Sequence, residues 1–328
     1  MARRRRRLTG RWVSIVTVVG IGVVVVWFFT RPGSNPQATS TPLAGAPRSD
    51  TPDPTPGEPL AAGPSEAGPA DGGGATSTGG DMAGAGLVAE GQRARQRGDL
   101  ITARTTLNRA LAKGLDDQQA VAVRQTLQEL ADETIFSARR IPGDPVVERH
   151  LVAKGETLGK IAARYHVTDN LLATINGLRN KNVIRQGQAF KVLTGPFHAV
   201  VHKELFRLDV YLGDLYVRSY PVGLGADDGT PTGVWAVKDK LVNPTYYPPR
   251  GGQIIAADDP KNPLGERWIG LHGISGDAKG QLRYGIHGTI EPDSIGKNVS
   301  MGCIRLRNPD VQALFDLVVV KHSKITVR

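Results

Sequence analysis

The stretch "LFRLDVYLGDLYVRSYPVGLG", residues 205–225, decides the fold of the largest part of the chain. Every second residue from Phe206 to Leu212 is apolar, and this period of two is typical of a strand with one buried face. Gly213 and Asp214 then supply a turn into a second strand-like run. The stretch therefore predicts a β-hairpin.

The residues after the hairpin extend the β-rich pattern to the end of the chain. "TPTGVWAVKDK", residues 230–240, predicts a third strand, and one helix is expected at 309–318. Glycine and proline punctuate much of the rest, which indicates many turns. We therefore predict a mostly β domain over residues 197–328, large enough to bury a core of its own.

A shorter pattern of strands and helices precedes this domain, over residues 148–194. It predicts a strand at 150–153, a helix capped by Thr157 that runs to residue 165, and a second helix at 169–176. "IRQGQAFKVL" then supplies a turn and a returning strand.

The segment resembles a LysM domain along its whole length. The resemblance rests on "GETL" at 155–158, "IN" at 175–176 and "I..GQ" at 184–188. It implies a βααβ fold that binds glycans containing N-acetylglucosamine, chiefly peptidoglycan and chitin. The glycan-contact residues that it implies are Gly155, Glu156, Thr157, Leu158 and Asn180. The alternative is that these loops only support the fold.

Residues 83–141 have a helical pattern. Leu100, Ala103 and Leu107 recur at spacings of three and four, as one face of a helix requires. "RGDL" and "KGLDDQQ" interrupt the pattern, so separate helices are expected. The segment resembles one tetratricopeptide-like helical hairpin plus a further helix. It is either a module that binds a protein partner or a small helical domain of unknown role.

The N-terminal part predicts a membrane anchor. Residues 1–11 are a basic tail with six arginines, and residues 12–29, "WVSIVTVVGIGVVVVWFF", carry no charge. Eighteen helical residues span roughly 27 Å, close to the hydrocarbon core of a bilayer. The arginines favour the cytoplasmic side, which places the rest of the chain in the periplasm or cell-wall space. A cleaved signal peptide is the alternative.

Residues 30–82 predict a disordered linker, because they hold ten of the 22 prolines and lack aromatic residues, valine and isoleucine. The net charge of +10 depends largely on the arginines at the N-terminus. Composition therefore makes no case for nucleic acid as a partner.

Cys303 is the only cysteine in the chain and lies in "YGIHGTIEPDSIGKNVSMGCIRL", residues 284–306. An unpaired thiol outside the cytoplasm suggests reactivity, and a buried, inert cysteine is the alternative. Acyl transfer by a thiol needs a base and donors for the oxyanion. His287 and His272 each have a glycine neighbour, so local chemistry leaves the base open. An imidazolium beside the thiol would lower its pKa.

The order of motifs in this region decides between the two histidines. "YPVGLG", "TPTGVW", "NPTYYPP", "DDPKNPLGERW", "YGIHGT" and "SMGCIRL" follow one another, and the region resembles the L,D-transpeptidase catalytic domain of the YkuD type. The resemblance implies a β-sandwich with a capping subregion. It implies Cys303 as nucleophile, His287 as base, and the backbone carbonyl of Gly288 as the group that orients the imidazole.

Other residues around the nucleophile have expected roles. Backbone N–H groups near Gly302 and Cys303 are expected to form the oxyanion hole. Ser300 and Arg305 occupy family motif positions, and Arg305 either holds a substrate carboxylate or pairs with an internal one. His272 is expected to line the path of the acceptor. Met301 stands where many family members have histidine.

The resemblance implies a multidomain α+β enzyme that acts on peptidoglycan. Its thiol attacks the third residue of a tetrapeptide stem, releases D-alanine and forms a 3–3 cross-link, without metal or cofactor. The expected partners are stem peptides and glycan strands. Transfer to water or to a lipoprotein lysine, and a non-catalytic wall-binding protein, are alternatives. A papain-like peptidase would have its cysteine before its histidine in the chain, which is the reverse of the order found.

Overall fold

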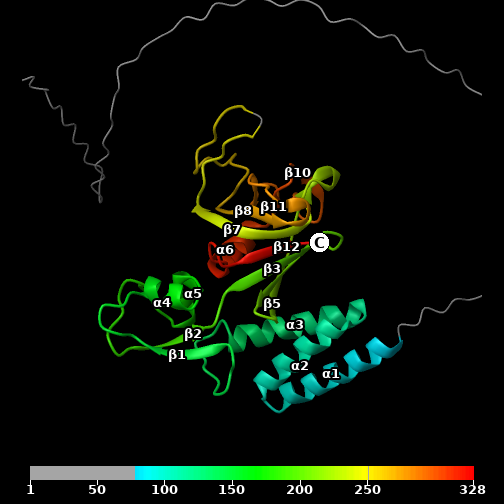
Figure 1. Ribbon diagram of the computed structural model, residues 1–328, viewed down its shortest axis with the longest axis vertical. Coiled ribbons are helices and arrows are strands. Elements are labelled where there is room, and N and C mark those ends of the chain that lie inside the picture. Colours follow the sequence, from blue (N-terminus) through cyan, green and yellow to red (C-terminus); the bar gives the residue numbers. More distant parts are fainter. Residues whose placement is uncertain (1–77, 250) are drawn as a thin grey trace, which may run out of the picture. The chain divides into compact units, whose positions relative to one another are not determined.

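The computed structural model describes residues 78–249 and 251–328 (Figure 1). The predicted basic tail, the membrane anchor and most of the linker lie outside the described residues. Within these ranges no helix has both the length and the apolar character needed to cross a bilayer. Three helices, a βααβ unit and a β-rich domain follow one another along the described chain.

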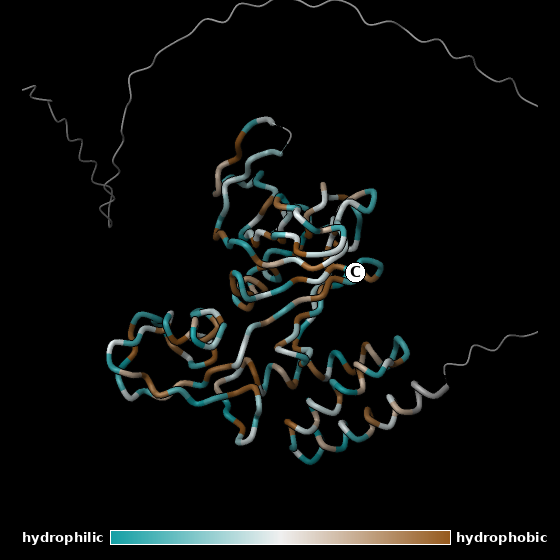
Figure 2. The backbone as a smooth tube through the Cα atoms, viewed as in Figure 1, coloured by the Kyte–Doolittle hydropathy of each residue, from teal (hydrophilic) through white to brown (hydrophobic). Residues whose placement is uncertain are grey.

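The first part consists of three helices, α1 (Thr78–Gln96), α2 (Leu100–Lys113) and α3 (Asp117–Thr134). They break at the two interruptions that the sequence predicts. The side chains of Asp99 and Asp116 accept hydrogen bonds from the backbone N–H groups of Thr102 and Gln119, which caps α2 and α3. Figure 2 shows hydrophobic and hydrophilic residues alternating along these helices. Helix α1 begins inside the stretch predicted as linker.

The second part is a βααβ unit of β1 (Val147–Leu151), α4 (Leu158–Arg164), α5 (Asp169–Ile175) and β2 (Ala189–Leu193). The two strands pair antiparallel. Thr157 and Thr168 cap the two helices by accepting hydrogen bonds from the backbone N–H groups of Lys160 and Leu171. The predicted order of strand, two helices and returning strand is confirmed.

The third part is built on one mixed sheet of eight strands, in the order β11-β9-β8-β7-β12-β3-β4-β5 (Figure 1). The strands are β3 (Phe197–His202), β4 (Arg207–Leu212), β5 (Leu215–Pro221), β7 (Gly233–Val242), β8 (Arg267–Ser275), β9 (Tyr284–His287), β11 (Ile304–Arg305) and β12 (Lys324–Val327). Helix α6 (Asn308–Leu317) lies between β11 and β12 in the chain. The strands β6 (Leu224–Gly225) and β10 (Asn298–Ser300) form a separate parallel pair.

The predicted hairpin is β4 and β5 at one edge of this sheet, and β11 is at the other edge. The resemblance implied a sandwich of two sheets. The main sheet of this domain is instead one continuous sheet of eight strands. The predicted buried face is confirmed, since Leu208, Val210 and Leu212 are buried. The expectation of only one buried face does not hold for β4, because Asp209 on the opposite face is also fully buried.

The three helices bury this second face of the hairpin. Arg124 of α3 lies 3.7 Å from the Asp209 carboxylate, and Arg218 of β5 forms an ion pair with Asp132. Tyr216 is fully buried in the core of the helices. Its backbone N–H donates to Oδ1 of Asn108 at 2.7 Å. The helices therefore cover the edge strand β5, whose free N–H groups would otherwise be exposed.

A buried lysine joins the βααβ unit to the end of α3. Lys191 of β2 is 2% exposed, and its ammonium donates to the carbonyl oxygens of Thr134, Ser137 and Arg139 at 2.6, 2.9 and 2.8 Å. Burial lowers the pKa of Lys191 to about 8, so the side chain remains charged at neutral pH. Its three donors match the three acceptors.

Replacing Lys191 with methionine is expected to lower the free energy of unfolding by about 2–5 kcal/mol, because the buried carbonyl group of Thr134 and two partly buried ones lose their donor. Urea unfolding measures this loss. Lys181→Met is the matched control, since Lys181 is 45% exposed and its ammonium contacts Asp169, which is 40% exposed, and the side chain of Asn170. It should change stability by less than about 1 kcal/mol. Equal midpoints for the two variants would contradict the proposed role of Lys191 in stability.

Candidate active site

The edge strands β9 and β11 bring a histidine and the cysteine to one face of the sheet. The strands pair in parallel, with Ile304 opposite Ile286, and both isoleucines are buried in the core. Because successive side chains of a strand point to opposite faces, His287 and Cys303 lie on the other face. The same register places Cys303 beside Gly285, whose backbone is hydrogen-bonded to the thiol.

His287 is buried, with 5% of its surface exposed. Its Nδ1 lies 2.6 Å from the carbonyl oxygen of Gly288. Since a carbonyl oxygen only accepts hydrogen bonds, Nδ1 carries the proton and Nε2 is left as the basic nitrogen. This contact with Gly288 is the one that the resemblance implied, and its catalytic role stays a prediction.

The environment of His287 disfavours its charged form. Burial lowers the pKa of His287 to about 4, and the positive charge of Arg305 acts in the same direction, while the hydrogen bond to Gly288 opposes them. The indole ring of Trp268 stacks on the imidazole at 5.9 Å with 20° between the planes. The imidazole is therefore neutral at pH 7.

Sequence reasoning missed Trp268. In β8 it lies opposite His287, and its Nε1 donates to Asp239 at 3.2 Å. A Cβ atom at Gly285 would lie 2.5 Å from the indole ring, so only glycine leaves room for it. The register of β8 against β9 is the signal that identifies Trp268, and this register is not available from local sequence.

Replacing Trp268 with leucine is expected to raise the pKa of His287 from about 4 toward the ordinary value of about 6.5, because water gains access to the ring. An NMR titration of the His287 ring measures the shift. Trp268→Phe keeps an aromatic ring over the imidazole and is the matched control, with a smaller expected shift. An unchanged pKa in Trp268→Leu would show that the indole does not keep water from His287.

Cys303 follows a turn that only glycine fits. Gly302 has φ of +117°, which side-chain-bearing residues rarely adopt. A Cβ atom there would lie 2.7 Å from the carbonyl oxygen of Gly229 and 2.7 Å from the Tyr284 ring. The hydroxyl of Ser300 donates to the carbonyl oxygen of Cys303 at 2.6 Å and accepts from the N–H of Gly302 at 3.1 Å. Ser300 therefore fixes the turn.

These contacts correct the expected oxyanion hole. The Gly302 N–H is already used by Ser300, and so it is not free to bind an oxyanion. The backbone N–H of Cys303 donates to no acceptor in residues 78–249 and 251–328. Cys303 N–H is therefore the backbone donor at this turn that can bind a developing negative charge.

The charge state of the pair also differs from the expected thiolate and imidazolium. Burial raises the pKa of the Cys303 thiol, while the hydrogen bond from Gly285 and the charge of Arg305 lower it less. Burial penalises both charged forms together. With the pKa of His287 at about 4, a neutral thiol and a neutral imidazole are favoured at rest.

Arg305 pairs with an internal carboxylate. Its Nη1 lies 2.8 Å from Oε2 of Glu291, and the Arg305 side chain is 17% exposed. Of the two roles that the sequence left open, the structure contains the internal pair. The nearby positive charge still lowers the pKa values of Cys303 and His287.

Two further residues singled out from the sequence, His272 and Met301, are exposed. His272 is exposed on β8, beyond the stretch of β8 that pairs with β9. Met301, beside the nucleophile, is 64% exposed. His272 and Met301 are thus available to a substrate, and their contacts with one stay predictions. The described residues contain no group of histidine, cysteine and acidic side chains arranged for a metal ion.

Four of the five predicted glycan-contact residues make contacts inside the βααβ unit. Glu156 accepts hydrogen bonds within it, Thr157 caps α4, and Leu158 is buried. Gly155 and Asn180 lie on exposed loops, and Oδ1 of Asn180 accepts from the backbone N–H of Asn182 at 2.9 Å. These contacts fit the supporting role that was the alternative, and glycan binding by the five residues stays a prediction.

Comparison with known proteins agrees with both resemblances. The L,D-transpeptidase catalytic domain matches residues 196–327, and the LysM domain matches residues 150–192. YqjB of Bacillus subtilis, named as an L,D-transpeptidase, is 42% identical over 131 residues, which cover 39% of this chain and 69% of that protein. YkuD of Bacillus licheniformis, named likewise, is 33% identical over 175 residues, which cover 51% and 91%. A solved L,D-transpeptidase from Mycobacterium smegmatis is 19% identical, with a TM-score of 0.31, over 43% of this chain and 63% of that one.

Proposed function

Since this chain belongs to the L,D-transpeptidase family and carries a LysM domain, we propose that it cross-links peptidoglycan with Cys303 as nucleophile and His287 as base. The observation that carries this proposal is the parallel register of β9 and β11. It puts the thiol and the imidazole on one face, at the end of a sheet whose other face is core. The hydrogen bond to Gly288 leaves Nε2 of His287 free to take a proton.

The first step of the proposed reaction transfers an acyl group to the enzyme. Sγ of Cys303 attacks the carbonyl carbon of the third residue of a tetrapeptide stem as His287 Nε2 takes the thiol proton. The carbonyl oxygen becomes an oxyanion and is bound by the N–H of Cys303. The bond to the terminal D-alanine then breaks, and His287 returns the proton to the leaving amine. A thioester on Cys303 remains.

The second step transfers the acyl group to an amine. The side-chain amine of the third residue in a neighbouring stem attacks the thioester carbonyl, and His287 takes the proton that this amine loses. The carbon–sulfur bond breaks and the thiol regains its proton. The product is a 3–3 cross-link, and no metal or cofactor takes part in either step.

The resting charge state fits general-base catalysis. A thiol whose pKa is raised by burial does not ionise in advance. The imidazole is in the neutral form that can accept a proton, although its pKa of about 4 makes it a weak base. Proton transfer therefore accompanies the attack on the carbonyl. No charged pair has to be held in a buried site before the substrate arrives, which would cost desolvation energy.

The LysM domain and the N-terminal segment supply the proposed location. The LysM domain binds glycan strands through its exposed loops, with Gly155 and Asn180 as candidate contacts. Residues 12–29 anchor the chain as a single-pass membrane protein, with the domains in the periplasm or cell-wall space, and 30–82 act as the linker. The sequence pattern alone supports this placement. Transfer to water or to a lipoprotein lysine is the same first step with another acceptor.

Product analysis tests the proposed function. The full chain is incubated with a disaccharide tetrapeptide, and the products are identified by tandem mass spectrometry. The expected products are free D-alanine and a dimer linked between the third residues of two stems. A tripeptide without dimer would identify water as the acceptor. Neither D-alanine nor dimer would contradict the proposed function and favour a wall-binding role.

A further inference from the structure

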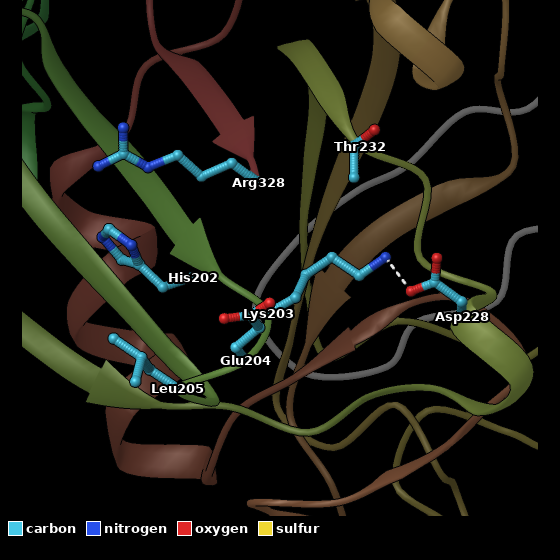
Figure 3. Close-up of a pocket in the computed structure, with 7 residues that line it drawn as sticks. All are labelled: His202, Lys203, Glu204, Leu205, Asp228, Thr232 and Arg328. Atoms are coloured by element: carbon cyan, nitrogen blue, oxygen red, sulfur yellow. Dashed lines mark ion pairs between the residues drawn. The ribbon is translucent and has the colours of Figure 1, made fainter. Parts of the chain in front are cut away.

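A pocket of about 500 Å³ opens at the β3–β4 turn (Figure 3). Its lining comes from this turn, the loop after β6 and the end of β12, and consists of His202, Lys203, Glu204, Leu205, Asp228, Thr232 and Arg328. Neither Cys303 nor His287 belongs to the lining. Figure 3 shows the Lys203 side chain extending toward Asp228, and the two form an ion pair.

The loop that Lys203 reaches has a strained backbone. Asp227 and Asp228 have φ of +50° and +57°. Left-handed φ values at two successive residues other than glycine cost free energy, and they persist only where surrounding contacts hold them. Lys203, whose side chain is 15% exposed, forms an ion pair with Asp228, whose side chain is 82% exposed, and also donates to the backbone carbonyl oxygen of Thr230 in the same loop.

The opposite side of this loop is in close backbone contact with the turn before the nucleophile. A Cβ atom at Gly225 would lie 2.8 Å from Cα of Gly302, and one at Gly302 would lie 2.7 Å from the carbonyl oxygen of Gly229. The loop and the turn therefore meet backbone to backbone, with three glycines at the contact. Because no side chain lies between the two backbones at this contact, a movement of the loop would displace Gly302 directly.

A chain of hydrogen bonds crosses the loop from the pocket to the turn. Nζ of Lys203 donates to the carbonyl oxygen of Thr230 at 2.8 Å. The Thr230 hydroxyl accepts from the N–H of Gly225 at 2.8 Å and donates to the carbonyl oxygen of Gly302 at 3.0 Å. Thr230 is buried, with 2% exposed. Lys203 is thus linked to Gly302 through one buried residue.

The carbonyl of Gly302 and the N–H of Cys303 belong to the same planar peptide group and point in opposite directions. A hydrogen bond that fixes the carbonyl therefore fixes the direction of the N–H. We propose that Lys203, acting through Thr230, is a positioning residue that aims the Cys303 N–H at the oxyanion. This inference rests on the proposed function.

The test compares two reactions of the same thiol. A carbapenem is a β-lactam whose amide carbonyl the Cys303 thiol is expected to attack under the proposed function. That acylation passes through an oxyanion, whereas alkylation by iodoacetamide does not. Lys203→Met and Thr230→Val are expected to lower the limiting rate of acylation about 10- to 100-fold. The concentration for half-maximal acylation and the rate of alkylation should stay close to those of the unsubstituted chain. Intact-mass spectrometry of the full chain measures both reactions.

Conservative variants separate positioning from simple loss of stability. Lys203→Arg keeps a cationic donor and Thr230→Ser keeps the hydroxyl, so both should acylate within about threefold of the unsubstituted rate. Glu204→Gln, which alters the lining of the same pocket, is the matched control. Because Lys203 acts through Thr230, the double variant Lys203→Met/Thr230→Val should be no slower than Thr230→Val alone.

Three results would overturn the inference. These are an unchanged acylation rate in both Lys203→Met and Thr230→Val, a proportional loss of alkylation, or additive losses in the double variant. If the unsubstituted chain is alkylated by iodoacetamide but forms no carbapenem adduct on Cys303, the proposed function fails and this inference fails with it. Normal adduct formation in the unsubstituted chain and in both variants contradicts the positioning role alone.

Discussion

Replacing Cys303 with alanine is expected to lower the rate of D-alanine release by about 10⁴-fold or more, because the atom that forms the acyl-enzyme bond is lost. Release of D-alanine from a disaccharide tetrapeptide by the full chain measures this loss. The alanine side chain is smaller than the thiol and leaves the Ser300 contacts to the backbone in place. The turn around residue 303 should therefore keep its conformation.

Met301→Ala is the matched control for this substitution. Met301 is 64% exposed beside the nucleophile, so its truncation removes side-chain surface without removing the thiol. It should retain most of the rate and change mainly the affinity for the stem peptide. If Cys303→Ala retained more than about 1% of the rate while Met301→Ala behaved as expected, another residue would have to be the nucleophile.

Replacing His287 with glutamine is expected to lower the acylation rate near pH 7 by about 10³-fold, because the proton acceptor is lost. The thiol pKa is raised by burial, so few thiolate ions form without a base at this pH. The rate of the variant should then rise about tenfold per pH unit as the thiolate forms. The rate of the unsubstituted chain should be nearly constant between pH 6 and 8, because its base has a pKa of about 4.

The pH profile of carbapenem acylation measures both curves. His272→Gln is the matched control, since His272 is exposed and beyond the strand pairing that holds His287, and its acylation profile should follow that of the unsubstituted chain. A rate near the unsubstituted value in His287→Gln, or a large loss in His272→Gln alone, would assign the base to His272 instead.

The low pKa of His287 also affects stability. The folded-state pKa of about 4 lies below the ordinary value of 6.5, so the unfolded chain binds a proton at this residue more readily than the folded chain does. The stability contributed by the neutral imidazole is therefore complete above about pH 6.5 and is lost as the pH falls from there toward 4.

The sequence was sufficient for features that repeat locally. The alternation from Phe206 to Leu212 predicted the hairpin, and the threonine at residue 157 predicted a helix start that the structure contains. The burial of Asp209 on the opposite face was not predictable in this way. The carboxylate pairs with Arg207 on its own strand at 2.8 Å and with His202 of β3 at 3.2 Å, and α3, which is far away in sequence, places Arg124 at 3.7 Å from it.

The residues of the candidate site also fall into those that local sequence identifies and those that depend on contacts between distant segments. Motif order selected Cys303, His287 and the Gly288 carbonyl, because these residues lie within short, recognisable stretches, and their catalytic roles stay predictions. Trp268 and Lys203 were missed, since each reaches the site through strand register or a loop contact between distant segments. The neutral resting pair was missed for a related reason, because burial comes from tertiary packing and cannot be inferred from residue spacing.

The Arg305 and LysM residues show how folding contacts compete with binding roles. Arg305 and Glu156 were both candidates for ligand contacts, and both form ion pairs within the chain, Arg305 with the exposed Glu291 and Glu156 with Arg164. A charged residue in a family motif can be retained for either reason, and only the partner's position in the fold distinguishes the two. Gly155 lies on an exposed loop, whereas Asn180, also exposed, already accepts a hydrogen bond from the N–H of Asn182 with its side-chain oxygen.

The acyl-enzyme itself tests the central claim most directly. The full chain is mixed with a disaccharide tetrapeptide, quenched in acid within the first turnover and digested, and the peptide that contains Cys303 is analysed by mass spectrometry. We predict a thioester between Cys303 and the disaccharide tripeptide, with the mass of the terminal D-alanine lost from the stem. Formation of 3–3 dimers without an acyl group on Cys303, or with the acyl group on another residue, would contradict the account.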